Sequence, residues 1–258
     1  MSINVDWVNT KIQEIWEDHS QFLAENRPNG ESPWPRWPAL YDELIENPDV
    51  LYVGLNPSFY KDQMKQRLQE YMEPLELDDL RWTGHDEDVH DFLKWERKYA
   101  KESYSYFTPM RNFGIDHDLM WEHIDIFVTR VTSQNKLDDS IGVEAYTEGK
   151  HQHAFLKRQL DLFFSLLNEL APDVVVVENA LARDFLKGTR LKNTTYDLTP
   201  EENVDPESGY QTIELKDETP IFFSGMLSGR RALDIGSRQR LHWHVAKAHN
   251  NIQGGIDQ

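Results

Sequence analysis

Four short apolar runs limit the folds open to this chain more than any other feature. They are "DVLYVGL" (49–55), "HIDIFVTRV" (123–131), "DVVVVEN" (173–179) and "TPIFFSG" (219–225). Each has the length and composition of a strand that is buried on both faces, as strands of parallel sheets are. Helix-length segments separate the runs, which is typical of a parallel sheet covered by helices on both sides. We therefore expect an α/β fold, a three-layer αβα sandwich with a central, mainly parallel four-stranded sheet.

The segments between these runs carry apolar residues at helical spacing. The clearest pattern covers 151–172, where Pro172 closes the segment. Residues 190–218 are polar instead and predict loops and a β-hairpin. We expect helices over 5–25, 60–72, about 88–103, 151–172, from about 180 onwards, and over 237–250.

The length of 258 residues suits a single domain. We expect residues 1–48 to form a helical and loop extension, 49–250 the core, and 251–258 a frayed tail. The chain contains no Cys, which excludes disulfides, a thiolate nucleophile and cysteine-bound metal. No apolar run is long enough to span a membrane, and the first residues lack the features of a signal peptide, so we expect a cytoplasmic protein.

The net charge of −18 argues against a nucleic-acid partner when it is taken as a single number. Its distribution changes that reading. Residues 224–250 hold five of the 27 basic residues and one of the 45 acidic residues, a net charge of +4. The rest of the chain therefore carries a net charge of −22. A basic segment of this kind can contact phosphates, although cations also favour the C-terminal turns of any helix.

Polar residues follow the predicted strands at their carboxyl ends, where open α/β sheets bind ligands. Asn56 stands at the first of these ends and Asn179 at the third. Either amide could instead cap a helix, as Asn often does. The four strand ends are 54–58, 129–130, 178–179 and 224–229.

"VGLNPS" (53–58) resembles the first motif of the uracil-DNA glycosylase superfamily, in the Gly-x-Asn-Pro form of its mismatch-specific and thymine-DNA glycosylase branch. The run 123–131 stands where that superfamily has its base-recognising strand, and 173–179 resembles its third strand. "FFSGMLSGRR" (222–231) stands where it has its second motif, a loop with a Leu that enters the duplex. "SYSYFTPMRNFG" (103–114) stands where an aromatic residue stacks on the flipped base.

The resemblance implies an αβα enzyme that cleaves the N-glycosidic bond between a base and its deoxyribose and leaves an abasic site. It implies a monofunctional glycosylase that acts on DNA as a monomer, without a membrane, a metal or a cofactor. The catalytic residue would be Asn56; Leu55, Tyr106, Phe107, Arg130 and Asn179 would contact the base; Ser58, Met226, Leu227, Ser228, Arg230 and Arg231 would contact DNA.

These residue types suit the chemistry. A base must leave the stack before its glycosidic bond can be reached, at a cost of about a few kcal/mol, and Met226 and Leu227 would fill the gap that it leaves. Asn56 would orient the attacking water. An amide is a feeble general base, so the reaction would depend mainly on stabilising the departing base.

Two departures from the superfamily pattern bear on the substrate. The second motif opens with Phe223-Ser224-Gly225 instead of His-Pro or Asn-Pro, so only Ser224 could donate a hydrogen bond to the departing base from there. Arg130 stands where an Asn reads uracil, and an arginine only donates hydrogen bonds. Asp125 could orient Arg130 or be structural.

We therefore expect a damaged or modified base as the substrate instead of plain uracil. One such base is the glucosylated hydroxymethylcytosine of phage DNA, in which case the protein would serve antiviral defence and not DNA repair. The alternative is a non-catalytic nucleic-acid-binding or acidic interaction protein on the same fold.

Overall fold

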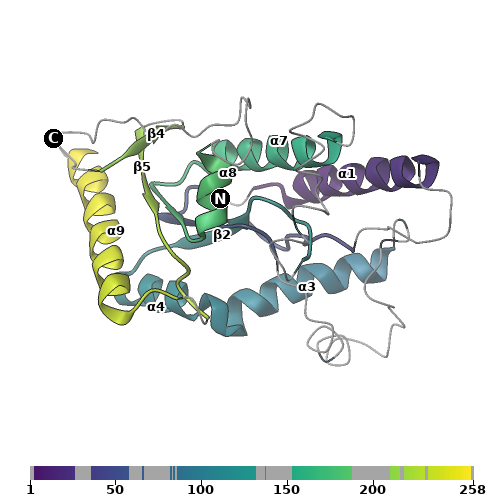
Figure 1. The fold of residues 1–258 in the computed structure, drawn as a ribbon. Helices are drawn as coiled ribbons and strands as arrows, with labels where there is room; N and C mark the ends of the chain where they lie inside the picture. Colours follow the sequence, from purple (N-terminus) through teal and green to yellow (C-terminus); the bar gives the residue numbers. More distant parts are fainter. Residues whose placement is uncertain are drawn as a thin grey trace.

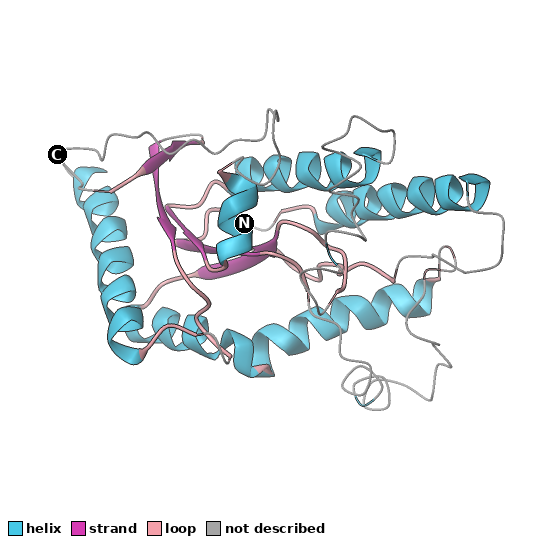
Figure 2. Cartoon of the chain, in the orientation of Figure 1, coloured by secondary structure: helices cyan, strands magenta, loops and turns pink. Residues whose placement is uncertain are grey.

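The computed structural model shows an α/β fold built on a five-stranded sheet, with strand order β2-β1-β3-β5-β4 (Figures 1 and 2). Four strands run parallel: β1 (Val50–Gly54), β2 (Trp121–Asp125), β3 (Val174–Val177) and β5 (Glu218–Phe223). The structure describes residues 3–26, 36–57, 66, 82, 84, 86–131, 137, 153–187, 210–215, 218–229 and 232–256.

A fifth strand, β4 (Thr212–Glu214), pairs antiparallel with β5 at the edge of the sheet. The sheet therefore has one strand more than the four expected. The two strands are joined within 215–217, so they form a hairpin that overlaps the polar segment for which one was predicted.

Helices cover both faces of the sheet, as the apolar runs predicted. Leu51 and Val53 of β1 lie in one core cluster, while Val50 and Tyr52 lie in a second. Within the described ranges, no helix combines the length and the apolar character needed to cross a membrane. The first cluster includes residues of α1 (Val5–Asn26), α3 (Glu87–Ser103), α7 (His153–Leu170) and α8 (Ala180–Leu186); the second includes residues of α3, the 3-10 helix η1 (Ser105–Phe107), α4 (Thr108–His117) and α9 (Ile235–Ile256).

The second strand ends earlier than its apolar run suggested, at Asp125 instead of residue 131. Its neighbour β1 stops opposite it, with Gly54 paired to Asp125. Beyond that pair the β1 chain bends at Leu55, so single backbone hydrogen bonds but no regular strand pairing join it to the residues up to 131. The carboxyl end of this strand therefore presents different residues from the predicted Thr129 and Arg130.

The two ends of the chain also differ from expectation. α9 continues to Ile256, so 251–256 are helical and not a frayed tail. Gln253 donates a hydrogen bond to Asp173, and Ile252 packs on the second cluster, which explains why the helix persists. At the other end, α1 packs against α7 inside the first cluster and is part of the core. The helix predicted over 60–72 lies outside the described residues, apart from residue 66.

Candidate functional site

The turn after β1 holds the side chain of Asn56 in one orientation. Its Nδ2 lies 2.7 Å from the carbonyl oxygen of Val131, 3.3 Å from that of Thr129 and 3.0 Å from that of Pro57. Only the amino group can donate to carbonyls, so this setting fixes which end of the amide faces them. Among the described residues, nothing donates to Oδ1, and the residue is partly exposed. Asn56 therefore keeps an open hydrogen-bond acceptor.

Gly54, two residues earlier, is required by close packing. A Cβ atom there would lie 2.4 Å from Oδ1 of Asp125 and 2.9 Å from Nε2 of His123. Contacts this short do not occur, so any side chain would displace these two groups from the end of β2. The glycine of the Gly-Leu-Asn-Pro turn thus makes room for a carboxyl group and an imidazole.

Five polar side chains, four of them buried and one partly exposed, meet at this end of the sheet, and we call them the carboxyl-edge cluster. His123 and Asp125 come from β2, Glu178 directly follows β3, Arg97 lies on α3 and Tyr106 on η1. The Tyr106 hydroxyl donates to Oε1 of Glu178 at 2.7 Å, and Nε2 of His123 lies 3.3 Å from the same oxygen. Arg97 donates to the carbonyl oxygen of His123 and forms an ion pair with Asp125 at 3.5 Å.

Burial shifts the protonation of these groups. It raises the pKa of Glu178 well above its usual value, with a further rise from the charge of Asp125, while the Tyr106 hydrogen bond opposes the shift. Burial also raises the pKa of Asp125 to about 6, although Arg97 lowers it. The pKa of His123 falls well below its usual value because of burial and the nearby charges of Arg97 and Lys101. Perturbed groups gathered in this way are typical of functional sites.

Among the described residues, three atoms of the cluster are buried without a hydrogen-bond partner: Oε2 of Glu178, Nε2 of His123 and Nε of Arg97. The imidazole lies within ion-pair distance of Glu178, but its N–H does not point along a hydrogen bond. Buried polar atoms nearly always have a hydrogen-bond partner, so the unpaired atoms of this cluster call for an explanation.

The two aromatic residues predicted to stack on a base border this cluster. Phe107 is buried, with its ring centroid 5.0 Å from that of His123 and 4.9 Å from that of Tyr106. Tyr106 is partly exposed and is fixed through its hydroxyl to Glu178. Leu55, also predicted to contact the base, is buried in the first core cluster.

The structure gives Arg130 and Asn179 other partners than a base. Arg130 is buried, and its guanidinium lies 3.0 Å from Oε2 of Glu96. Asp125, which could have oriented it, pairs with Arg97 instead. Asn179 caps α8, where its Oδ1 accepts hydrogen bonds from two backbone amides of the first turn. The alternative reading of Asn179 as a helix cap is therefore confirmed, and the base-reading role of Arg130 gains no support.

The loop after β5 only partly matches its predicted role. Leu227 is fully buried in the second core cluster, which corrects the expectation that it enters the duplex. Met226 and Ser228 are partly exposed, and the Ser224 hydroxyl donates to the carbonyl oxygen of Gly225. The other predicted DNA contacts, Ser58, Arg230 and Arg231, lie outside the described residues.

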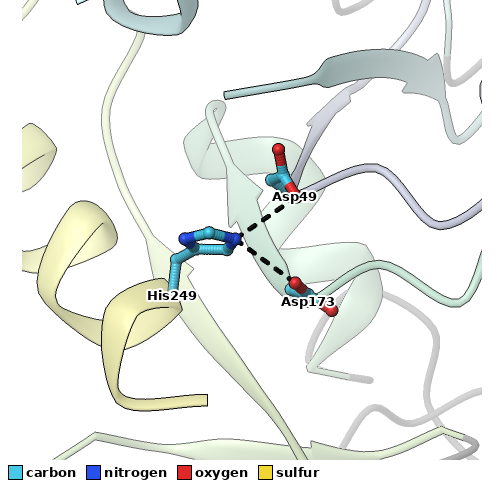
Figure 3. A group of neighbouring side chains, drawn as sticks. All are labelled: Asp49, Asp173 and His249. Carbon is cyan, nitrogen blue, oxygen red and sulfur yellow. Dashed lines mark hydrogen bonds and ion pairs between the residues drawn. The ribbon is translucent and has the colours of Figure 1, made fainter. Parts of the chain in front are cut away.

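The opposite edge of the sheet carries a second polar group, which Figure 3 shows. Nε2 of His249 on α9 lies 3.2 Å from Oδ1 of Asp49, just before β1, and 3.4 Å from Oδ2 of Asp173, just before β3. We call these three residues the amino-edge group. In the described part of the chain, they alone bring three possible metal ligands together. Their bonds to one another tie α9 to the starts of two strands.

No family model matches the chain, and no curated protein is significantly similar to it. The proposal below therefore depends on the geometry of the site and on the resemblance of the Gly-Leu-Asn-Pro sequence to the first motif of the uracil-DNA glycosylase superfamily.

Proposed function

We propose that the protein is a DNA glycosylase that hydrolyses the N-glycosidic bond of a flipped, damaged or modified base and leaves an abasic site. The observation that carries this proposal is the state of Asn56. Its amino group is engaged by backbone carbonyls, while Oδ1 has no donor among the described residues. A fixed acceptor of this kind can receive a hydrogen bond from water and direct the oxygen lone pair toward the anomeric carbon.

The amide sets the order of events. It cannot take up the proton of the water, so the base must depart before the water can attack effectively. Departure leaves positive charge on the sugar and negative charge on the base. The site must therefore stabilise an anion, and hydrogen-bond donors in a buried setting are the usual means.

Binding of the base is assigned to the aromatic pair beside the cluster. The ring of Tyr106 is partly exposed and can stack on a flipped base, with Phe107 supporting it from below. Met226 is the remaining residue of the loop that could fill the gap in the duplex. The basic segment 224–250 would contact phosphates, and the acidic remainder of the chain would confine DNA to that face.

The proposal includes the finer fold and the substrate class. The parallel sheet and the turn after β1 are in keeping with a uracil-DNA glycosylase-like sandwich. The buried ion pair of Arg130 removes one reason for preferring a base with an added substituent. Glucosylated hydroxymethylcytosine of phage DNA is therefore one member of the panel to be assayed, and antiviral defence and DNA repair are both open roles.

The direct test is excision from single- and double-stranded oligonucleotides that each carry one modified base, read out as strand cleavage after alkali. Asn56→Ala should reduce the single-turnover rate on an accepted substrate by about 100-fold or more. Asn179→Ala is the matched control. It removes a helix cap, so it should lower stability by about 1 kcal/mol and leave the rate unchanged.

The burial of Leu227 and the ion pair of Arg130 favour the second candidate, a protein on the same fold without catalysis. Salt-dependent DNA binding without excision of any base would support a nucleic-acid-binding protein. The absence of both would support an acidic interaction protein.

A further inference from the structure

Glu178 is the one carboxyl group around the carboxyl-edge cluster that has no cation in the described part of the chain. Three other buried carboxyl groups there have one each. Glu178 is itself only 1% exposed, and a carboxylate buried without a counter-ion is strongly disfavoured. The charge balance therefore favours its neutral form. The three pairs are Glu96 with Arg130 at 3.0 Å, Glu122 with Lys101 at 2.8 Å, and Asp125 with Arg97 at 3.5 Å.

The hydrogen bonds around His123 show that it is not the missing cation. Nη2 of Arg97 lies 3.1 Å from Nδ1 of His123, and an arginine can only donate. Nδ1 must therefore accept, so the imidazole is neutral and carries its proton on Nε2. Nε2 lies 3.3 Å from Oε1 of Glu178, but the two are not aligned for a hydrogen bond.

The same bonds decide which oxygen of Glu178 holds the acid proton. Oε1 already accepts a hydrogen bond from the Tyr106 hydroxyl at 2.7 Å, and Nε2 of His123 lies 3.3 Å from it. Oε2 is buried and has no partner. The proton therefore belongs on Oε2, where it forms a free donor at the carboxyl end of β3. β3 is paired to β1, the strand that leads to Asn56.

We propose that Glu178 is a catalytic residue, a neutral carboxylic acid whose Oε2–H donates a hydrogen bond to the departing base. This inference rests on the proposed glycosylase function. When the glycosidic bond breaks, its electron pair leaves with the base, and the hydrogen bond from Oε2 stabilises the anion that forms. Water then adds its hydroxyl group to the anomeric carbon, and its remaining proton neutralises the base. Glu178 keeps its proton throughout.

The shift in the pKa of Glu178 agrees with this role, since burial and the nearby Asp125 both disfavour the carboxylate. A buried carboxylic acid can act as a strong donor to a developing anion. It also supplies what the loop after β5 lacks, because the hydroxyl of Ser224 is directed to the carbonyl of Gly225. Oε2 is closed to solvent, so an entering base must displace the atoms that cover it.

The test is the single-turnover excision rate as a function of pH. The wild-type rate should fall at alkaline pH, as Glu178 ionises among Tyr52, Tyr106, His123, Asp125 and Arg97. Glu178→Gln keeps an N–H donor and the acceptor for Tyr106 but cannot ionise, so its profile should lose the alkaline fall. Glu178→Ala should lower the rate at neutral pH by about 100- to 1,000-fold. Its deficit should be smaller on bases with electron-withdrawing substituents, whose anions need less help.

Several results would overturn the inference. A wild-type rate for Glu178→Ala, or an alkaline fall that persists in Glu178→Gln, would exclude the donor role. A uniform deficit on all bases, together with a lowered melting temperature, would make Glu178 only a structural residue. In each of these cases Asn56→Ala would still be inactive and the glycosylase proposal would stand. If the wild type excises no base, the proposed function itself fails.

Discussion

Acidic residues lie at both ends of the parallel strands, which we call the amino edge and the carboxyl edge, but their burial and ion pairing differ. At the amino edge, Asp49 and Asp173 share the imidazole of His249, and both carboxyl groups are partly exposed. At the carboxyl edge, Asp125 and Glu178 are buried and have one guanidinium between them.

This difference is our reason for assigning a structural role to the amino-edge group and for proposing a functional role for the carboxyl-edge cluster. The amino-edge group makes bonds that hold α9 against the strands and keeps both of its carboxyl groups partly exposed, and the atom that it leaves buried without a described partner is Nδ1 of His249. The carboxyl-edge cluster retains a buried carboxyl oxygen without a partner, which lowers stability. A buried carboxyl oxygen without a partner calls for an explanation, and the donor role proposed for Glu178 provides one.

Removing the guanidinium of the carboxyl-edge cluster should have the largest effect on stability. Arg97→Met leaves Asp125 buried without its cation, so we expect the free energy of unfolding to fall by about 3–5 kcal/mol. Chemical denaturation measures this. Arg158→Met is the matched control, because Arg158 pairs with Asp18 at the surface and its loss should change stability by less than about 1 kcal/mol. Equal effects of the two changes would remove the distinction between buried and surface pairs.

The titration of Asp125 should lower the stability of the folded protein as the pH rises from about 4 to 6. Its pKa is raised to about 6 in the folded protein, against 3.8 for an ordinary Asp. Between these values the unfolded chain has lost the proton that the folded protein keeps, so this residue's contribution falls as pH rises from about 4 to 6. The pKa difference, which already includes the opposing effect of Arg97, corresponds to a loss of up to about 3 kcal/mol.

The measurement compares unfolding of the wild type with that of Asp125→Asn across this range. The variant carries a neutral amide at every pH, so its residue 125 does not titrate. The change in the difference between the two proteins with pH isolates the titration. A wild-type advantage that grows from pH 4 to 6 would show that the carboxylate is the stable form and would contradict the assignment.

A substitution at Gly54 tests how tightly the backbone of β1 packs against the carboxyl-edge cluster. Gly54→Ala places a Cβ against Asp125 and His123, so we expect a loss of about 1–3 kcal/mol together with a loss of excision. Gly254→Ala on α9 is the control, since a Cβ there meets nothing within 4 Å. In a helix that change should stabilise by about 0.5–1 kcal/mol. A tolerated Gly54→Ala would mean that the cluster is loosely packed.

Much of the fold could be predicted, because apolar runs and helical periodicity report burial directly. All four apolar runs overlap a strand of the parallel sheet, and α3 and α8 lie close to where the pattern placed them. The length of a strand is harder to predict. Residues 126–131 remain apolar because they are buried in loops, so composition could not show that the strand had ended at Asp125.

The parts of the candidate site that lie within one short sequence could be predicted. The residues that reach the site from other elements of the fold were harder to predict. The Asn-Pro turn could be identified from five adjacent residues. Arg97 reaches the cluster from α3, and nothing local marks it, whereas Tyr106 on η1 was predicted only through the family resemblance. His123 and Asp125 carried a usable signal, two polar side chains on the same face of an apolar strand. Placing the strand end six residues too late, at 131 instead of Asp125, directed attention to Arg130 instead.

The amino edge should show the smallest effect. Asp173→Asn removes the charge that faces His249 but leaves an oxygen to accept the hydrogen bond from Gln253. Asp49 still faces the imidazole at 3.2 Å, and the site is partly exposed. We expect the free energy of unfolding to fall by less than about 1 kcal/mol, and the excision rate to stay at the wild-type value. Because the burial of Asp173 raises its pKa, the neutral amide also relieves part of a desolvation penalty. A loss of stability as large as that of Arg97→Met would show that the charges at the two edges are equally buried. The unpaired Oε2 of Glu178 would then be no guide to function.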